Sequence, residues 1–485
     1  MQAPNCIREA CFNTCCSPPL LHTSPPPSSD FVSAIASTLH PHKVFTNHES
    51  LPPPGELLSA LTAAVPSYSN NSAAQEYRHL GRVSLDYIGH GLFSYAQAET
   101  HERFFDFAYG GVETELHAAA KRRVMKYMNL SEEDYAIVFT ANQSSAFSLL
   151  AQSYPFESHQ NLVTVYDHDS EALKPMTDAA GKWHQSATFS WPGLRVNSRK
   201  LRKILRSKKG GLLAFPLQSK VSGARYSYQW MNLARENGWH VLLDASALAA
   251  KEMETLGLSL FHPDFIICSF FKIFGKNPSG FCCLAVKKSS ASVLKRPSTN
   301  MGIVNLVPEP KAVDGTNSTT NDEVIEFGGL DDADELGLIG ISRRVRCLVN
   351  WVVNALQSLR HPGDQGLPLV EVYGPGVRVD RGAAVAFNVC DWKGERVDPV
   401  LVQKLADRTN ISLGIGFLNN IWKKKRKSQE DCGVGLGVVS ASLGMLSDFQ
   451  DVYRLWAFVA RFLDADFVEK EKWRYTALNQ TTVEL

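Results

Sequence analysis

Residues 264–275 read DFIICSFFKIFG, an apolar run that is interrupted by a single lysine, Lys272. A short run of apolar and aromatic residues is typical of a buried strand. A lysine in such surroundings is poorly solvated, which lowers its pKa and frees a neutral amine for a Schiff base with an aldehyde. The alternative is a lysine that snorkels from the strand end into solvent, which is the commoner situation for lysines.

Residues 239–244 read WHVLLD, a second apolar strand, and it ends on the carboxylate of Asp244. Pyridoxal 5′-phosphate (PLP) needs both kinds of group, a lysine on its aldehyde carbon and an acid on its pyridinium nitrogen. The two strand ends therefore favour this cofactor, with Lys272 and Asp244 as the catalytic residues.

A phosphate site is predicted within residues 135–147, which read YAIVFTANQSSAF. The pattern is that of a strand, a short polar turn and the start of a helix, where free N–H groups and the helix dipole attract anions. A serine in such a turn is also an ordinary helix cap, so the prediction depends on Asp244 and Lys272. The residues expected around the cofactor here are Asn142, Gln143, Ser144 and Ser145.

Apolar strands alternate with helical patterns from about residue 80 onward. This rhythm predicts an α/β fold with crossover connections, a largely parallel sheet and helices on both faces. The strands expected in the sheet are Tyr135–Thr140, Asn161–Tyr166, Leu212–Pro216, Val241–Asp244, Phe265–Phe270 and Gly280–Val286.

The chain is expected to divide into three parts. They are an N-terminal tail and lead-in rich in Cys, Ser and Pro (1–80), a large PLP-binding domain (81–345) and a small α+β domain (346–485). Within the large domain, residues 289–325 are rich in Ser, Pro, Asn and Thr and are expected to form an exposed loop. In the small domain, the last helix is expected to begin at Ser447, with a capping box to Gln450.

The charge balance and the cysteine positions exclude several classes of protein. The 50 Lys and Arg against 49 Asp and Glu give a formal net charge of +1, so no overall field favours nucleic acid or a membrane surface. Cysteines inside apolar stretches indicate buried, reduced thiols and a cytoplasmic protein, with organellar or nuclear targeting left open. The N-terminal cysteines match no zinc spacing, so no metal is expected, and a mobile tail is favoured over a transit peptide.

Four strings of residues carry a resemblance to a known family. They are SLDYIG at 84–89, FTANQS at 139–144, LDAS at 243–246 and, most specifically, SFFKIFG at 269–275. The chain resembles the PLP domain of the molybdenum cofactor sulfurases, within the class V aminotransferase and cysteine desulfurase group. It is more closely similar to the plant sulfurase-like proteins that keep this domain.

The resemblance implies a PLP-dependent fold of type I, in which a large domain with a mixed, mostly parallel seven-stranded sheet precedes a small C-terminal domain. It also implies a homodimer. Lys272 would carry the cofactor, Asp244 would contact its ring nitrogen, and its phosphate would be bound by Ser269 and Ser144. His168 is either the residue that stacks on the cofactor ring or an ordinary loop histidine.

The function implied is that of an enzyme acting on an amino acid or a related amine. One alternative is a PLP-binding but catalytically degenerate protein with a regulatory or partner-binding role. Another is a scaffold that keeps the fold without cofactor. Retention of both Lys272 and Asp244 favours the first two over the scaffold.

Three features depart from the family. Residues 411–422 read ISLGIGFLNNIW and hold no cysteine, although desulfurases carry a catalytic cysteine on the corresponding mobile loop. Ser440 stands in place of an arginine that grips the substrate carboxylate, and Lys220 in place of an asparagine near the phenolic oxygen of the cofactor. Without a nearby thiolate to accept sulfur, the sequence predicts a poor cysteine desulfurase, with Cys432 as the nearest thiol along the chain.

Overall fold

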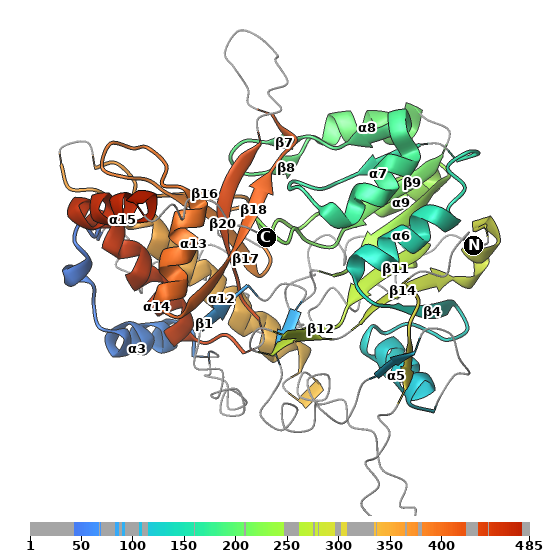
Figure 1. Cartoon of the computed structure of the whole chain (residues 1–485), viewed down its shortest axis with the longest axis horizontal. Helices are drawn as coiled ribbons and strands as arrows, with labels where there is room; N and C mark the ends of the chain where they lie inside the picture. The colour runs from blue at the N-terminus through green and yellow to red at the C-terminus, as the bar shows by residue number, and fades with distance from the viewer. Residues whose placement is uncertain are drawn as a thin grey trace, which may run out of the picture.

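The structure, a computed structural model, describes residues 43–477 with gaps, the longest of which are 69–82, 93–105, 247–260, 308–333 and 423–434. The predicted N-terminal tail up to residue 42 and Cys432 lie outside the described residues. Two units lie side by side in Figure 1, a large one around a seven-stranded sheet and a smaller one around a five-stranded sheet with the C-terminal helices. The predicted α/β fold is confirmed.

The seven-stranded sheet is mixed and mostly parallel. Five neighbouring strands run parallel to one another. The next strand, β14, is antiparallel to both of its neighbours, so the edge strand β4 beyond it runs in the same direction as the five. The carboxyl ends of six strands thus meet at one edge, where open α/β sheets bind ligands. Across the sheet the strands are β4 (Tyr135–Thr140), β14 (Cys282–Lys287), β11 (Phe265–Ser269), β10 (Trp239–Asp244), β9 (Gly211–Pro216), β5 (Leu162–Thr164) and β6 (His184–Ser186).

Both faces of this sheet are buried, which explains its unbroken apolar strands. Successive residues of β9 alternate between two core clusters, with Leu213 and Phe215 on one face and Leu212 and Ala214 on the other. The face of Leu212 is covered by α6 (Gln143–Ser153) and α7 (Lys174–Ala180), and the opposite face by α8 (Ser198–Ser207) and α9 (Gln229–Glu236) (Figure 1).

The strand that was expected to run into Lys272 is broken after Ser269. Phe270 donates its backbone N–H to the Phe281 carbonyl at 2.8 Å, and the two rings pack against each other with centroids 5.6 Å apart. A separate strand, β12 (Phe271–Phe274), then pairs with β2 (His90–Leu92) and β13 (Asn277–Ser279) in a sheet of its own. Lys272 therefore lies in a small sheet that follows the carboxyl end of β11.

The smaller unit is built on strands in the order β1 (Val83–Leu85), β18 (Ile411–Leu418), β20 (Leu436–Ser442), β17 (Ala384–Val389) and β16 (Val370–Tyr373). Around this sheet lie α12 (Leu338–Gln357), α13 (Pro399–Arg408), α14 (Phe449–Ala460) and α15 (Ala465–Ala477).

Two elements of the smaller unit fall across the predicted domain boundaries. β1 lies in the range expected for the large domain, yet it pairs with β18 because Val83 and Leu85 bury their side chains in this unit. α12 contacts β16 and β17 although it begins before residue 346.

Two local predictions are wrong. Residues 302–307 are not an exposed loop, because Val304 is 1% exposed and β15 (Asn305–Val307) pairs with β3 (Asp106–Ala108). The helix predicted to be the last one is α14, which α15 follows, and it is capped by Asp448 rather than Ser447, since the Asp448 and Asp451 side chains each accept the other's backbone N–H at 3.0 Å. A carboxylate suits this position because the helix dipole favours negative charge there. None of the described helices combines the length and the apolar character that a membrane crossing requires.

Candidate functional site

The carboxyl edge of the large sheet gathers polar side chains from segments that are distant in sequence. Gln143 opens α6 after β4, Tyr166 and Asp167 follow β5, Lys220 follows β9, and Asp244 ends β10. Because these strands share one direction, their ends bring the five side chains to the same edge.

The Asp244 carboxylate is 3% exposed and hydrogen-bonded through both oxygens. Oδ2 accepts the Tyr166 hydroxyl at 2.9 Å, and Oδ1 accepts the Ser246 backbone N–H at 3.0 Å as well as the Ser246 hydroxyl. Burial, followed by the charge of Asp244, raises the pKa of Tyr166 well above its ordinary value, so Tyr166 stays a donor. Pairing of this kind is what a carboxylate requires when it is buried.

Gln143 connects Asp244 to a buried lysine. The Lys220 ammonium donates to Gln143 Oε1 at 2.5 Å, and Gln143 Nε2 lies 2.7 Å from Ser246 Oγ and 3.3 Å from Asp244 Oδ2. Lysine only donates hydrogen bonds, so it orients the amide with its oxygen toward Lys220 and its N–H groups toward Asp244. The site therefore holds an ammonium and a carboxylate that are separated by one amide.

In the turn predicted to bind a phosphate, the helix-capping side chain already uses one of the backbone N–H groups. Asn142 Oδ1 accepts the Ser145 backbone N–H at 2.8 Å, whereas Ser144 is exposed in the first turn of α6. Gly302 (φ +89°) approaches so closely that a Cβ there would lie 2.7 Å from the Ser145 Cβ. The helix N-terminus is thus packed on the side of Ser145. Gln143, which was expected near the cofactor, hydrogen-bonds to Asp244.

Ser269 and Lys272 follow the strand next to β10. Ser269 ends β11 and is half-buried, while the backbone of Lys272 lies in β12, opposite Gly91 and Ser279. The side chain of Lys272 lies outside the described residues. Its place in the chain puts it after the same sheet edge as Asp244, and its role as the cofactor lysine stays a prediction.

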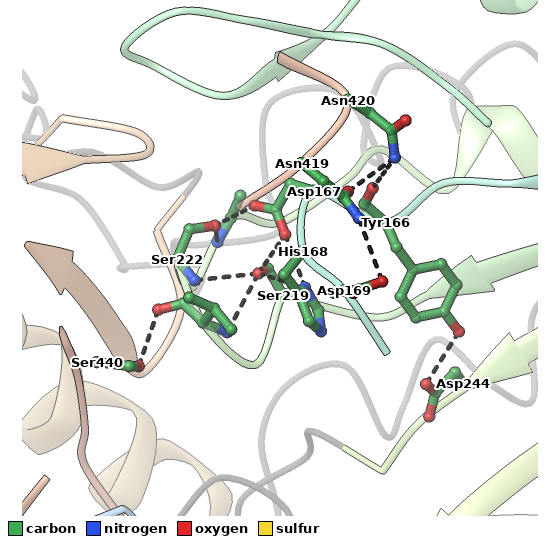
Figure 2. Close-up of polar contacts among 12 residues, drawn as sticks. Tyr166, Asp167, His168, Asp169, Ser219, Ser222, Asp244, Asn419, Asn420 and Ser440 are labelled. Atoms are coloured by element: carbon green, nitrogen blue, oxygen red, sulfur yellow. Dashed lines mark hydrogen bonds and ion pairs between the residues drawn. The ribbon is translucent and has the colours of Figure 1, made fainter. Parts of the chain in front are cut away.

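Asp167, which sequence reasoning missed, is the centre of a second cluster (Figure 2). This carboxylate is fully buried and accepts hydrogen bonds from Ser219 Oγ at 2.6 Å, from His168 Nδ1 at 2.9 Å and from the Ser222 hydroxyl. Burial raises the pKa of Asp167, but the hydrogen bond and charge of His168 and the two serine hydroxyls outweigh it, and the net shift is downward. The bond at Nδ1 fixes the orientation of the His168 ring.

We expect Asp167→Asn to lower the free energy of unfolding at pH 7 by about 3 kcal/mol, because it removes the charged partner of a buried cluster. The pKa of Asp167 is lower in the folded protein than in the unfolded chain. Its contribution is therefore complete above the unfolded value of about 4 and is lost as pH falls through the folded pKa.

Urea unfolding of the wild type and of Asp167→Asn, followed from pH 7 down to about pH 3, tests this expectation. The difference in stability should shrink at the acidic end. The exposed residue Asp169, replaced by Asn, is the control and should change little. A difference between wild type and Asp167→Asn that is constant over this range would contradict the assignment of a lowered pKa.

Residues 411–422, which correspond to the desulfurase loop, are hydrogen-bonded to the segment that contains Asp167. Residues 411–422 form β18 and β19 (Ile421–Trp422) rather than a loop, and β19 pairs with β7 (Phe189–Ser190) of the large unit. The Asn419 backbone N–H donates to the Asp167 carbonyl at 3.0 Å, and the side chains of Asn419 and Asn420 reach the Tyr166–Asp169 segment (Figure 2). The segment thus has no thiol and is held by backbone and side-chain hydrogen bonds.

Several residues of the site carried little signal in the sequence. Tyr166 and Asp167 end an apolar strand without a recognisable motif, and Ser219 and Ser222 are two serines in a loop. Ser246 could have been predicted as a site residue, because it completes the LDAS string that contains Asp244. Their partners come from other strands, which periodicity along one strand does not reveal.

The residues at this edge fit a phosphorylated pyridine aldehyde. The buried carboxylate of Asp244 suits a protonated ring nitrogen, and the α6 N-terminus beside Ser144 suits a phosphate. The backbone of Lys272, the predicted cofactor lysine, lies in β12, which follows β11 along the chain. His168 is buried beside this edge, where Tyr166 and His168 pack ring to ring at 5.9 Å.

Comparisons with known proteins point to one family. A family model described as aminotransferase class-V matches residues 95–455. The chain is 25% identical over 469 residues to the human molybdenum cofactor sulfurase, covering 80% of this chain and 50% of that protein. With the Arabidopsis thaliana molybdenum cofactor sulfurase it shares 26% identity over 472 residues, covering 79% of this chain and 57% of that protein. The chain spans about half the length of the curated relatives it matches, which include animal, fungal and plant proteins.

A solved structure shows the same fold. The cysteine desulfurase CsdA from Escherichia coli superimposes with a TM-score of 0.53 and 18% sequence identity, covering 81% of this chain and 99% of that one. The similarity supports the α/β fold described above.

Proposed function

The chain belongs to the aminotransferase class-V family, and on this basis we propose that it is a PLP-dependent enzyme acting on an amino acid or a related amine. The observation that carries the proposal is Asp244, a buried and fully paired carboxylate at the carboxyl end of a central strand. A buried acid at a ligand-binding edge, followed along the chain by a lysine after the neighbouring strand, is what PLP requires.

The roles of the residues follow from their positions. PLP, when bound, serves as an electron sink for bonds at the carbon next to the substrate nitrogen. Lys272 would hold the cofactor and, once released from it, accept or return a proton. Asp244 would keep the ring nitrogen protonated, while Tyr166, Ser246 and Gln143 hold its carboxylate in place. Ser144 and Ser269 would bind the phosphate, and His168 would face the ring.

Titration of the purified protein with PLP tests the proposal. A lysine-bound cofactor absorbs in the visible, at roughly 400–430 nm, because of its own chemistry. The band should appear at stoichiometric PLP and shift when an amino acid is added. A protein that binds PLP but leaves the band unchanged with every natural amino acid would favour the degenerate, regulatory alternative.

We also expect the protein to be a poor cysteine desulfurase by itself. Sulfur transfer from cysteine needs an attacking thiolate, and residues 411–422 offer none and are tied to the large unit. Release of alanine and sulfide from cysteine should therefore stay near background, with or without added thiol. Ordinary desulfurase turnover that is lost in Cys432→Ser would contradict this expectation.

Two further properties belong to the proposal. A homodimer and a cytoplasmic location are expected from the family and from the buried, free cysteines. Size-exclusion chromatography with light scattering measures the first, and fractionation the second.

A further inference from the structure

In the described part of the small unit, Ser440 stands where the family has its arginine. Ser440 in β20 is 6% exposed, and its hydroxyl donates to the Val221 carbonyl at 3.0 Å. The hydroxyl is thus engaged with backbone and carries no charge. An amino acid bound at this edge needs another partner for its carboxylate, since a buried anion without one is costly.

Arg381, the buried arginine that contacts the same loop, cannot take that role. Its five N–H donors all reach backbone carbonyls, namely those of Tyr373, Pro375, Ala384 and, in the large unit, Ser222. A guanidinium has no further donor to offer. Burial lowers the pKa of Arg381 to about 10, and the side chain acts as a clamp between the two units.

Lys220 lies on the loop that Ser440 contacts, one residue before Val221. Its ammonium has three donors, and Gln143 Oε1 is the acceptor it contacts within the described part of the chain. Among the residues that the structure describes, no carboxylate forms an ion pair with Lys220, and Asp244 is hydrogen-bonded to Tyr166, Ser246 and Gln143. Burial lowers the pKa of Lys220. A buried cation that no anion contacts is expected to shift in this direction.

We propose that Lys220 is the residue that binds the carboxylate of the substrate, so that the cation missing from β20 is supplied by the loop facing it. The inference rests on the proposed function and specifies its substrate class as amino acids rather than simple amines. A bound carboxylate would use the free donors of the ammonium and would remain beside Gln143. Ser440 and Lys220 thus depart from the family together, and the second departure compensates for the first.

The experiment uses the full chain with PLP bound and two matched pairs of probes, L-alanine with ethylamine and L-cysteine with cysteamine. Each amine is the amino acid without its carboxylate. The wild type should shift its visible band at amino-acid concentrations at least about tenfold below those of the amines, the scale of one charge-assisted hydrogen bond. Lys220→Met should lose this preference, and Lys220→Arg should keep most of it.

Ser440→Ala is the matched control, and it should keep the wild-type preference because its hydroxyl already binds the Val221 carbonyl. The inference is overturned if the wild type shows no preference or no response to the probes, or if Lys220→Met keeps the preference. It is also overturned if Lys220→Met no longer binds PLP, because Lys220 would then serve the cofactor. The proposed function itself is contradicted by a wild type that shows no band, or by a band that no natural amino acid shifts; a band that shifts without a preference for the amino acids contradicts the role of Lys220 alone.

Discussion

Lys272→Ala is expected to abolish the visible band of the PLP-loaded protein and to end all turnover. The lysine is the amine that holds the cofactor, and alanine offers no replacement. Treatment of the wild type with borohydride should fix PLP on one peptide, and mass spectrometry should place it on Lys272. The fold should persist, because β12 is held by backbone pairing with β2 and β13.

The control for this variant is Lys287→Ala, which removes a lysine from the end of β14 in the large sheet. Its band should match that of the wild type. An adduct on Lys220 or Lys276, or no adduct in a wild type that is otherwise folded, would show that the site is assigned to the wrong lysine.

Asp244→Asn is expected to lower turnover by roughly 10²-fold or more, the scale of losing one preorganised electrostatic contact in a buried site. Asparagine keeps the shape and one acceptor for Ser246, but it no longer favours a protonated ring nitrogen. Exchange of the α-hydrogen of amino acids in D₂O, followed by NMR, measures this without knowledge of the final product. Part of the PLP binding should survive.

Asp264→Asn provides the comparison at the opposite end of the same strands. Like Asp244, Asp264 accepts a backbone N–H, from Val241 at 2.8 Å, and a serine hydroxyl, from Ser290 at 2.5 Å. We expect this variant to lose stability but not the rate of α-hydrogen exchange. Equal losses of exchange in the two variants would mean that Asp244 is a structural carboxylate.

The sequence determined the sheet, because each strand buried on both faces has to be apolar along its whole length. Residues 135–140 and 211–216 are strands within a residue of the predicted bounds. Lys272 and Asp244 could be predicted as site residues from the sequence for a similar reason. A charged group at the end of an apolar strand is costly to bury unless it has a partner or a function. Family resemblance added the seven strands and the two units.

Only the tertiary structure decided which polar groups meet. Tyr166, Ser246 and Gln143 surround Asp244 because parallel strands place their carboxyl ends at one edge, although the residues lie far apart along the chain. Residues 411–422 were expected as a loop and became strands, because their partners, β20 and β7, lie elsewhere in the sequence. Periodicity along one segment reports burial of that segment, whereas hydrogen-bond partners across segments depend on the packing of the whole chain.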